Sequence, residues 1–194
     1  MHQLFSNLNK MILAGLGNIG EKYKNTRHNA GFIFLDYLSG EKEWEDNKNL
    51  HLLYKRHTFV SHHDRIVMEL IKPTTMMNDS GQALSQFLNF YKKNLSELIL
   101  IFDDLDLELG NWKYQHGKGP RIHNGLNSVE ESLGTTNFNR IRVGIQNAET
   151  RKVEDHKIIG ADYVLMPFTD DEIKILTETV FPQIKESLGL IVLG

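Results

Sequence analysis

The chain of 194 residues contains no cysteine. This absence excludes disulfide bonds, thiolate nucleophiles and thiolate-bound zinc, and it fits the reducing cytoplasm, where we expect the protein to act. No apolar run approaches the roughly 20 residues of a membrane span, so no membrane association is expected. Residues 1–10 are polar and unlike a signal or transit peptide, and we expect them to form a flexible extension. With 40% hydrophobic residues in the chain, residues 11–194 are expected to bury one core as a single domain.

Basic residues gather in one region, although the chain carries a net charge of −3. Between Gly110 and Lys152, seven basic residues face three acidic ones, which gives +4 there and −7 in the remainder. A basic surface on an acidic body is compatible with phosphate binding, but ordinary scatter of surface charge explains the count about equally well. The seven basic residues are Lys113, Lys118, Arg121, Arg140, Arg142, Arg151 and Lys152.

Hydrophobic periodicity predicts strands that alternate with helices. Strands are predicted over residues 11–14, 51–60, 65–71, 98–102, 111–115 (an edge strand) and 140–145. Helices are predicted over residues 30–38, 79–91, 124–133 and 170–188. Residues 41–49 are expected to form an exposed loop or a mobile helix. The alternation predicts an α/β three-layer sandwich, with a mixed, mainly parallel twisted sheet and helices on both faces.

One histidine stands out at the start of an apolar run, in the stretch Thr26–Gly31. His28 lies between an arginine and an asparagine, and a titratable imidazole with polar neighbours is suited to general base chemistry. The alternative is a polar turn before a helix. The preceding stretch, Gly15–Gly20, matches the dinucleotide pattern G-x-G-x-x-G, but no helical period follows it and Asp36 falls inside a predicted helix. An NAD-dependent oxidoreductase is therefore disfavoured.

Asp103 closes a predicted buried strand, at the end of the sheet where ligands bind. A carboxylate there can accept the N–H of a histidine and fix its tautomer; the alternative is a turn cap. Asn78 and Asn124 both stand at predicted helix starts, where they either cap the helix or hold a water or a substrate carbonyl. His62-His63-Asp64 is interpreted as solvated polar surface, since adjacent side chains on an extended backbone point apart.

Taken together, these stretches resemble the bacterial-type peptidyl-tRNA hydrolase family. The family pattern G-L-x-N-P-G-x-x-Y-x-x-T-R-H-N-x-G matches the first of them, and further family patterns follow in the same order and spacing over roughly residues 11–170. The matching stretches are Gly15–Gly31, Pro73–Gly81, Asp103–Leu107, His123–Leu126 and Arg140–Ile145.

The resemblance implies hydrolysis of the ester that joins a peptide to the 3′ end of tRNA. His28 would be the general base that activates water, and Asp103 would orient it and stabilise its cation. The resemblance also implies a monomer that binds the acceptor stem and 3′ end of peptidyl-tRNA and needs no metal or cofactor. The implied substrate or tRNA contacts are Asn18 (with a catalytic role in placing the water), Tyr23, Met77, Asn78, Lys113, Asn124 and Arg142.

Three departures from the family pattern concern RNA binding. Ile19 replaces a proline, and the glycine-rich loop becomes Gly117–Gly125 with Pro120 and Ile122, which restrict its backbone. The family pairs a lysine with the arginine of its phosphate clamp; the lysine position here is Gln115, and Lys113, two residues earlier on the same strand face, is its expected substitute. These departures leave open a non-catalytic RNA-binding relative.

Overall fold

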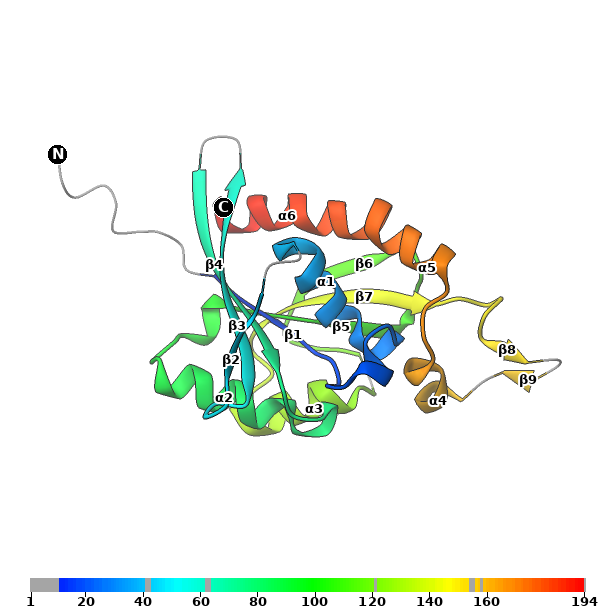
Figure 1. Ribbon diagram of the computed structural model, residues 1–194, viewed down its shortest axis with the longest axis horizontal. Coiled ribbons are helices and arrows are strands. Elements are labelled where there is room, and N and C mark those ends of the chain that lie inside the picture. Colours follow the sequence, from blue (N-terminus) through cyan, green and yellow to red (C-terminus); the bar gives the residue numbers. More distant parts are fainter. Residues whose placement is uncertain are drawn as a thin grey trace.

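The computed structural model describes residues 11–40, 43–61, 64–120, 122–153, 156–157 and 159–193. The expected extension over residues 1–10 and the pair His62-His63 lie outside the described residues. Over the described part, the chain forms a seven-stranded sheet in the order β2-β3-β4-β1-β5-β7-β6 and a separate two-stranded sheet, β8-β9 (Figure 1). The strands are β1 (Met11–Gly15), β2 (Glu45–Asn47), β3 (Leu52–Ser61), β4 (Asp64–Pro73), β5 (Leu98–Glu108), β6 (Trp112–His116), β7 (Asn139–Gln146), β8 (Lys152–Val153) and β9 (His156–Lys157).

The centre of the large sheet is parallel and its margins are antiparallel. Strand β1 pairs in parallel with β4 and β5, and β5 pairs in parallel with β7. The pairs β2–β3, β3–β4 and β6–β7 are antiparallel. The carboxyl ends of the parallel strands therefore share one edge, which points toward α4 and the β8–β9 hairpin (Figure 1). This is the edge at which a ligand site is expected in an α/β sheet.

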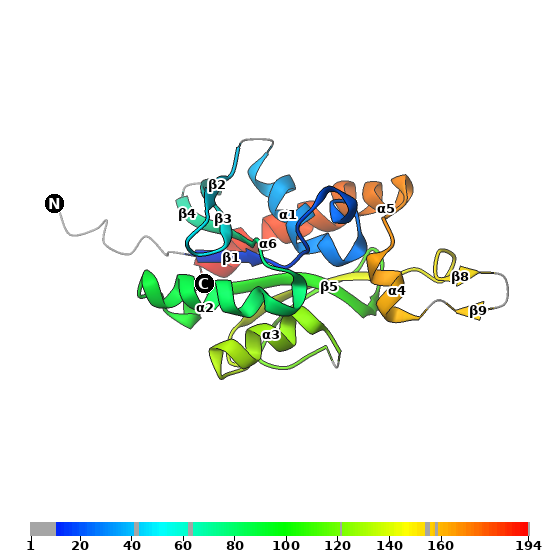
Figure 2. The same ribbon diagram turned by 60° about the horizontal axis from the view of Figure 1, so that its bottom comes forward.

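Helices cover both faces of the sheet, as predicted (Figure 2). Helices α1 and α6 lie on one face, and α2 and α3 lie on the other. Along β1, Leu13 packs in the hydrophobic core beneath α1 and α6, whereas Ile12 and Ala14 pack in the core beneath α2 and α3. A strand buried on both sides reads as a continuous apolar run, which explains the pattern from which β1 was predicted. The α-helices are α1 (Ala30–Ser39), α2 (Ser80–Phe90), α3 (Asn124–Leu133), α4 (Gly160–Leu165), α5 (Asp170–Ile175) and α6 (Phe181–Leu193).

Short 3₁₀ helices precede several of these elements, at Glu21–Tyr23, Arg27–Asn29, Met77–Asp79 and Leu95–Glu97. One prediction, for residues 41–49, was wrong at 45–47. Residues 45–47 form the edge strand β2, which is neither a loop nor a helix, because pairing with β3 satisfies their backbone groups. The predicted helix over 170–188 is interrupted by a π-helical turn, Leu176–Val180, between α5 and α6. Thr169 is the N-cap of α5 and forms a capping box with Glu172.

Candidate active site

The turn that carries His28 is held against the carboxyl ends of β1 and β5 by close backbone contact. A Cβ atom on Gly31 would lie 2.3 Å from the carbonyl oxygen of Ile101, and one on Gly15 would lie 2.6 Å from the oxygen of Gly31. Only glycine permits so close an approach between the start of α1 and these strands. Gly15, the first glycine of the dinucleotide-like pattern, therefore serves packing. Within residues 11–40, a 3₁₀ helix follows the turn where a dinucleotide site needs an α-helix.

His28 and Asp103, which are 75 positions apart in the chain, meet in a buried hydrogen bond. His28 Nδ1 lies 2.8 Å from Asp103 Oδ1. The same carboxylate oxygen lies 3.0 Å from Nε2 of His123. An ionised carboxylate only accepts, so each ring directs an N–H at it. With Nδ1 of His28 protonated, its Nε2 carries the lone pair that a general base needs.

The tautomer of His123 is fixed from its other side. His123 is the N-cap of α3, and its Nδ1 accepts the backbone N–H of Leu126 at 3.1 Å. Its proton must therefore sit on Nε2, which faces Asp103. The His28 and His123 rings lie 4.8 Å apart between centroids. Two imidazoles thus share one negative charge, and His28 is the one that lines both of the cavities described below.

Burial and charge act in opposite directions on this pair. Burial by itself lowers the pKa of the His28 imidazole, but the charge of Asp103 and the hydrogen bond to it raise the pKa above its ordinary value. Burial by itself raises the pKa of the Asp103 carboxyl, but His28 and His123 hold it far below its usual range. Asp103 is therefore ionised at neutral pH, and His28 acts as a base only above its raised pKa.

Asn18 belongs to the same arrangement through a network of backbone hydrogen bonds. The Asn18 N–H donates to Asn29 Oδ1 at 2.8 Å, and Asn29 Nδ2 donates back to the Asn18 carbonyl at 3.0 Å. The Asn18 Oδ1 accepts the N–H of Met77 at 2.8 Å. Because its side-chain oxygen is used in that contact, Asn18 offers its NH₂ group to a ligand. Asn29, the neighbour of His28 in the sequence, thus holds Asn18 in a fixed relation to the His28 turn.

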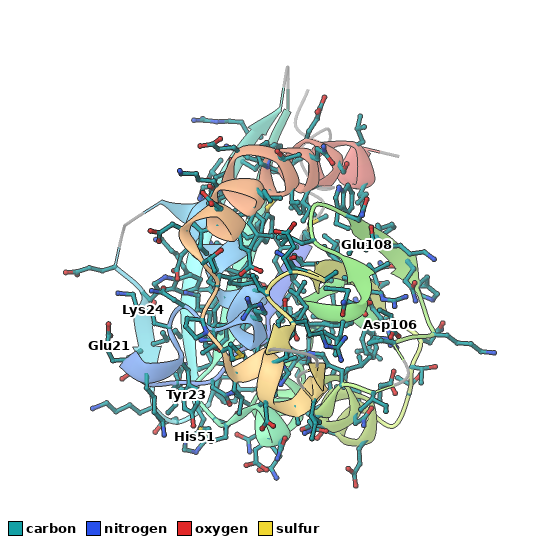
Figure 3. All side chains as sticks on the ribbon, turned by 90° about the vertical axis from the view of Figure 1, so that its right-hand side faces the viewer. Glu21, Tyr23, Lys24, His51, Asp106 and Glu108 are labelled. Atoms are coloured by element: carbon teal, nitrogen blue, oxygen red, sulfur yellow. The ribbon has the colours of Figure 1, made fainter. Side chains whose placement is uncertain are left out.

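Two cavities meet at His28. The first, of about 260 Å³, is lined by Asn18, Tyr23, His28, Met76, Met77, Asn78, Asn124, Ala161, Val164 and Leu165. The second, of about 490 Å³, is lined by His28, Asp103, Asp104, Leu105, Asp106, Pro120, Ile122, His123, Asn124, Arg151, Ile159, Gly160, Ala161 and Val164. Figure 3 views this end of the sheet and shows Tyr23 and Asp106, one from each cavity, on opposite sides. Residues shared by both cavities come from the His28 turn, the start of α3, and α4.

The structure thus gathers seven of the nine expected site residues around these cavities. The remaining two, Lys113 and Arg142, lie opposite each other on β6 and β7. We call Lys113, Gln115 and Arg142 the basic strip. Arg142 donates through Nε to Asp104 and through Nη1 to Gln115 Oε1 at 2.9 Å, so its charge is already neutralised. Lys113 is exposed. Asp104, which lines the second cavity, joins the strip to the site.

The count of seven basic residues therefore overstates the positive charge available to a ligand. Arg140 is fully buried and forms an ion pair with Glu130 at 2.7 Å, and Arg142 pairs with Asp104. The side chains of Arg121 and Lys152 lie outside the described residues. Lys113 and Lys118 are exposed.

Sequence reasoning gave no role to His123, Asn29 or α4. His123 and Asn29 stand inside the motifs that were singled out, so a signal existed, but their contacts with Asp103 and Asn18 depend on folding. The cavity-lining residues of α4, Ala161 and Val164, are apolar and match no motif. His28, Asp103 and His123 have ligand atoms within 4.8 Å of one another and could surround a metal ion, although their N–H donors already account for the arrangement. Metal-free chemistry remains a prediction.

Comparisons with known sequences and structures all match peptidyl-tRNA hydrolases. The family model described as peptidyl-tRNA hydrolase matches residues 12–193. The chain is 39% identical to a peptidyl-tRNA hydrolase of Bacillus subtilis, covering 90% of this chain and 88% of that protein, and 42% identical to one of Bacillus licheniformis, covering 88% and 86%. A crystal structure of the peptidyl-tRNA hydrolase of Acinetobacter baumannii superimposes with a TM-score of 0.80 at 28% identity, covering 96% and 90%. Among the described residues, no helix has both the length and the apolar character to cross a bilayer.

Proposed function

The chain belongs to the peptidyl-tRNA hydrolase family and hydrolyses peptidyl-tRNA, and we propose that His28, oriented by Asp103, is the general base of this reaction. The observation that carries the proposal is the 2.8 Å contact between His28 Nδ1 and Asp103, which leaves Nε2 unpaired on a largely buried imidazole that lines both cavities. An ester has an acyl side and an alcohol side, and a base at the junction of two cavities suits a substrate that extends in both directions.

The proposed reaction needs one water and one base. His28 Nε2 takes a proton from water as the water oxygen bonds to the ester carbonyl carbon, and Asp103 stabilises the imidazolium that forms. The proton then passes to the ribose oxygen as the carbon–oxygen bond breaks, which releases the free peptide acid and the tRNA 3′ hydroxyl. Asn18 and Asn124, whose side chains line the first cavity with His28, are the donors we assign to the substrate carbonyl and the water.

We assign substrate positioning to the other residues of the first cavity. Asn78 is exposed there and offers its amide to the peptide main chain, whereas Met77 is buried and contributes its backbone N–H to the placement of Asn18. Tyr23 lies at the cavity wall. We propose that the acceptor stem of tRNA follows the basic strip, with Lys113 as its exposed cation, since phosphate contacts supply most of the sequence-independent affinity for nucleic acid.

We further propose that residues 11–194 act as one catalytic domain, as a cytoplasmic monomer. What supports a single domain is that the cavity walls come from segments as far apart as Asn18 and Leu165. The monomer and its location remain expectations from the resemblance and the composition.

The test is the hydrolysis of an N-blocked aminoacyl-tRNA beside its free-amine counterpart. We expect cleavage of the blocked ester alone, because that ester resembles the end of a peptidyl-tRNA. Cleavage of both esters would assign a broader esterase. Binding of tRNA without cleavage of either would identify a non-catalytic RNA-binding relative and refute the role of His28.

A further inference from the structure

The residue before the base, Arg27, points away from the cavities into a fully enclosed polar junction. Its side chain is 1% exposed and donates through Nη2 to Glu172 Oε2 at 2.7 Å. Its Nη1 donates to the carbonyl oxygens of Met166 and Pro167, at 3.3 and 3.0 Å. Its guanidinium also lies 4.1 Å from the ring centroid of Tyr163 in α4. A buried arginine with this many fixed contacts immobilises the backbone to which it is attached.

Glu172 is satisfied from several directions at once. Its Oε2 also accepts the N–H of Thr169 at 2.9 Å, and its Oε1 accepts from Thr150 Oγ1 at 2.8 Å and from Asn147 Nδ2 at 3.1 Å. Burial by itself raises the pKa of the Glu172 carboxyl, but the hydrogen bonds from Thr169, Arg27 and Thr150, together with the charge of Arg27, lower it below its ordinary value. The carboxylate is therefore ionised across the neutral range and holds Arg27 by a full charge.

The junction ties the His28 turn to the wall of both cavities. Backbone contacts extend the link to the two residues before Arg27, since the Phe168 N–H donates to the Asn25 carbonyl at 2.9 Å and Thr26 forms a β-bridge with Pro167. The segment on the other side of the link is the end of α4, whose Ala161 and Val164 line both cavities. Displacing Arg27 would therefore move the base and a shared cavity wall together.

We infer that Arg27 and Glu172 are positioning residues for catalysis, which set the relation of His28 to Asp103 and to the α4 wall. Neither side chain lines the two cavities, so both would act through the turn that they hold. The inference rests on the proposed function of His28. It gives the motif residue Arg27 a role, and it adds a requirement for Glu172, which lies outside every motif that was singled out.

The chain offers a closely matched control in Arg140. Arg140 is 0% exposed, pairs with Glu130 at 2.7 Å and donates to the carbonyls of Gly119 and Thr136, each at 2.9 Å. It also lies 4.4 Å from the ring centroid of Phe138. Both arginines thus combine an ion pair, two carbonyl acceptors and an aromatic ring, but Arg140 holds no part of the His28 turn. Substitutions in the two junctions should cost comparable stability and differ in their effect on the reaction.

The first experiment compares kcat and KM for an N-blocked aminoacyl-tRNA. Arg27→Lys, Glu172→Gln and the milder Thr150→Val, which removes one hydroxyl from the junction, are set against Arg140→Lys and Glu130→Gln. We expect kcat to fall roughly 10- to 100-fold for Glu172→Gln, since misplacement of a reacting group by about 1 Å has that effect. Arg27→Lys keeps the charge and should retain more activity than Arg27→Met. The control pair should lower the melting temperature and leave kcat unchanged.

The second experiment follows the ionisation of His28 directly, by NMR titration of its ring and of the Nδ1–H signal. The titratable or charged groups that face His28 are Asp103 and His123, and those that share a cavity wall with it are Tyr23, Asp104, Asp106 and Arg151. Because Asp103 raises the pKa of His28, loosening the turn should move that pKa downward and weaken the Nδ1–H signal. The acidic limb of the kcat profile should move to lower pH in parallel.

Two results overturn the inference. One is a Glu172→Gln or Thr150→Val variant that is less stable but keeps the wild-type kcat, pH profile and Nδ1–H signal. The other is an Arg140→Lys control that shifts the His28 titration as much as Arg27→Lys does. If the wild-type protein cleaves no ester, the proposed function fails, whereas the titration still decides whether Arg27 and Glu172 position His28. If Arg27→Met does not fold, Thr150→Val carries the test.

Discussion

The proposed catalytic centre and the basic strip are linked through the neighbouring residues Asp103 and Asp104 but are constructed in opposite ways. In the centre, Asp103 collects two N–H donors and leaves the Nε2 of His28 free to react. In the strip, the charge of Arg142 is taken up by Asp104 and its second donor by Gln115, so Lys113 is the exposed cation. From this difference we expect that the proposed site keeps its chemistry, although the charge that we propose to attract the tRNA is reduced. Rate and affinity should then respond to separate sets of substitutions.

The largest effect is expected from His28→Ala. Loss of the general base should lower kcat about 10³-fold, because no other group at the cavity junction has a free imidazole nitrogen aligned by Asp103. Binding of tRNA should remain, since the basic strip is untouched, and a filter-binding assay beside single-turnover kinetics measures both. A kcat within tenfold of wild type would show that His28 is not the general base.

Asp103→Asn should have the next largest effect. We expect kcat to fall about 10²-fold, because the amide lacks the charge that stabilises the imidazolium. Its single oxygen also replaces a carboxylate that accepts an N–H from each of the two imidazole rings. In the wild type, the acidic limb of the rate profile should lie above about pH 6.5, since Asp103 raises the pKa of His28. In the variant that limb should move to lower pH, because burial alone lowers the pKa. An unchanged limb would contradict the pairing.

The same pair sets a pH dependence of stability. The pKa of His28 is raised on folding, so its contribution is complete below its unfolded pKa and is lost as the pH rises through the folded value. The pKa of Asp103 is lowered, so its contribution is lost only as the pH falls through that lower value. The free energy of unfolding, measured with denaturant, should therefore differ less between wild type and Asp103→Asn at alkaline pH, where the contribution of charged His28 is lost. Curves that diverge further above neutral pH would argue against a shared charge.

Lys113→Ala tests the other side of the comparison. We expect tRNA affinity to fall about three- to tenfold, with a shallower dependence on salt by about one unit of slope, because one phosphate contact is lost. The kcat should be unchanged. The exposed Lys185 on α6 provides the control, since Lys185→Ala removes the same charge from another face. Equal losses for both lysines would show that overall charge, and no particular strip, attracts the tRNA.

The smallest effect is expected from Gln115→Lys, which restores the family's lysine. The new cation would stand beside Arg142 in place of a neutral acceptor, and we expect about threefold tighter tRNA binding and a steeper salt slope. The experiment is a salt series of tRNA titrations on wild type and variant. Weaker binding would mean that the hydrogen bond between Gln115 and Arg142 matters more for tRNA affinity than an added positive charge.

Much of the fold could be predicted because its central elements are unambiguous in the sequence. Strands such as β1, buried on both faces, read as unbroken apolar runs, and α2 and α3 show a helical period. Short elements were missed, because β2 depends on pairing with β3, and α4 has six residues. Strand β5 extends to Glu108, beyond the expected end near Asp103, because pairing with β7 resumes there after an irregularity.

In the site too, residues marked by local sequence could be predicted, whereas residues that act through contacts formed on folding could not. His28, Asp103, Asn78 and Asn124 could be singled out from residue type and position in the chain, and Asn18 followed from the resemblance. The role of Arg27 could not be inferred, because its partner Glu172 lies 145 positions away and carries no motif. His123 was overlooked as a second donor to Asp103, since sequence alone does not show which way a helix-capping ring turns.

The large separation of Arg27 and Glu172 in the sequence has a consequence for the synthesis of the protein. During synthesis the ribosome delivers the turn with His28 early and Glu172 near the end, so the turn waits for its anchor through most of translation. A chain released before that point would hold every motif residue up to Arg142 and still lack the ion pair that fixes the turn. Under the role inferred for this pair, such a chain is expected to hydrolyse esters more slowly than the complete protein.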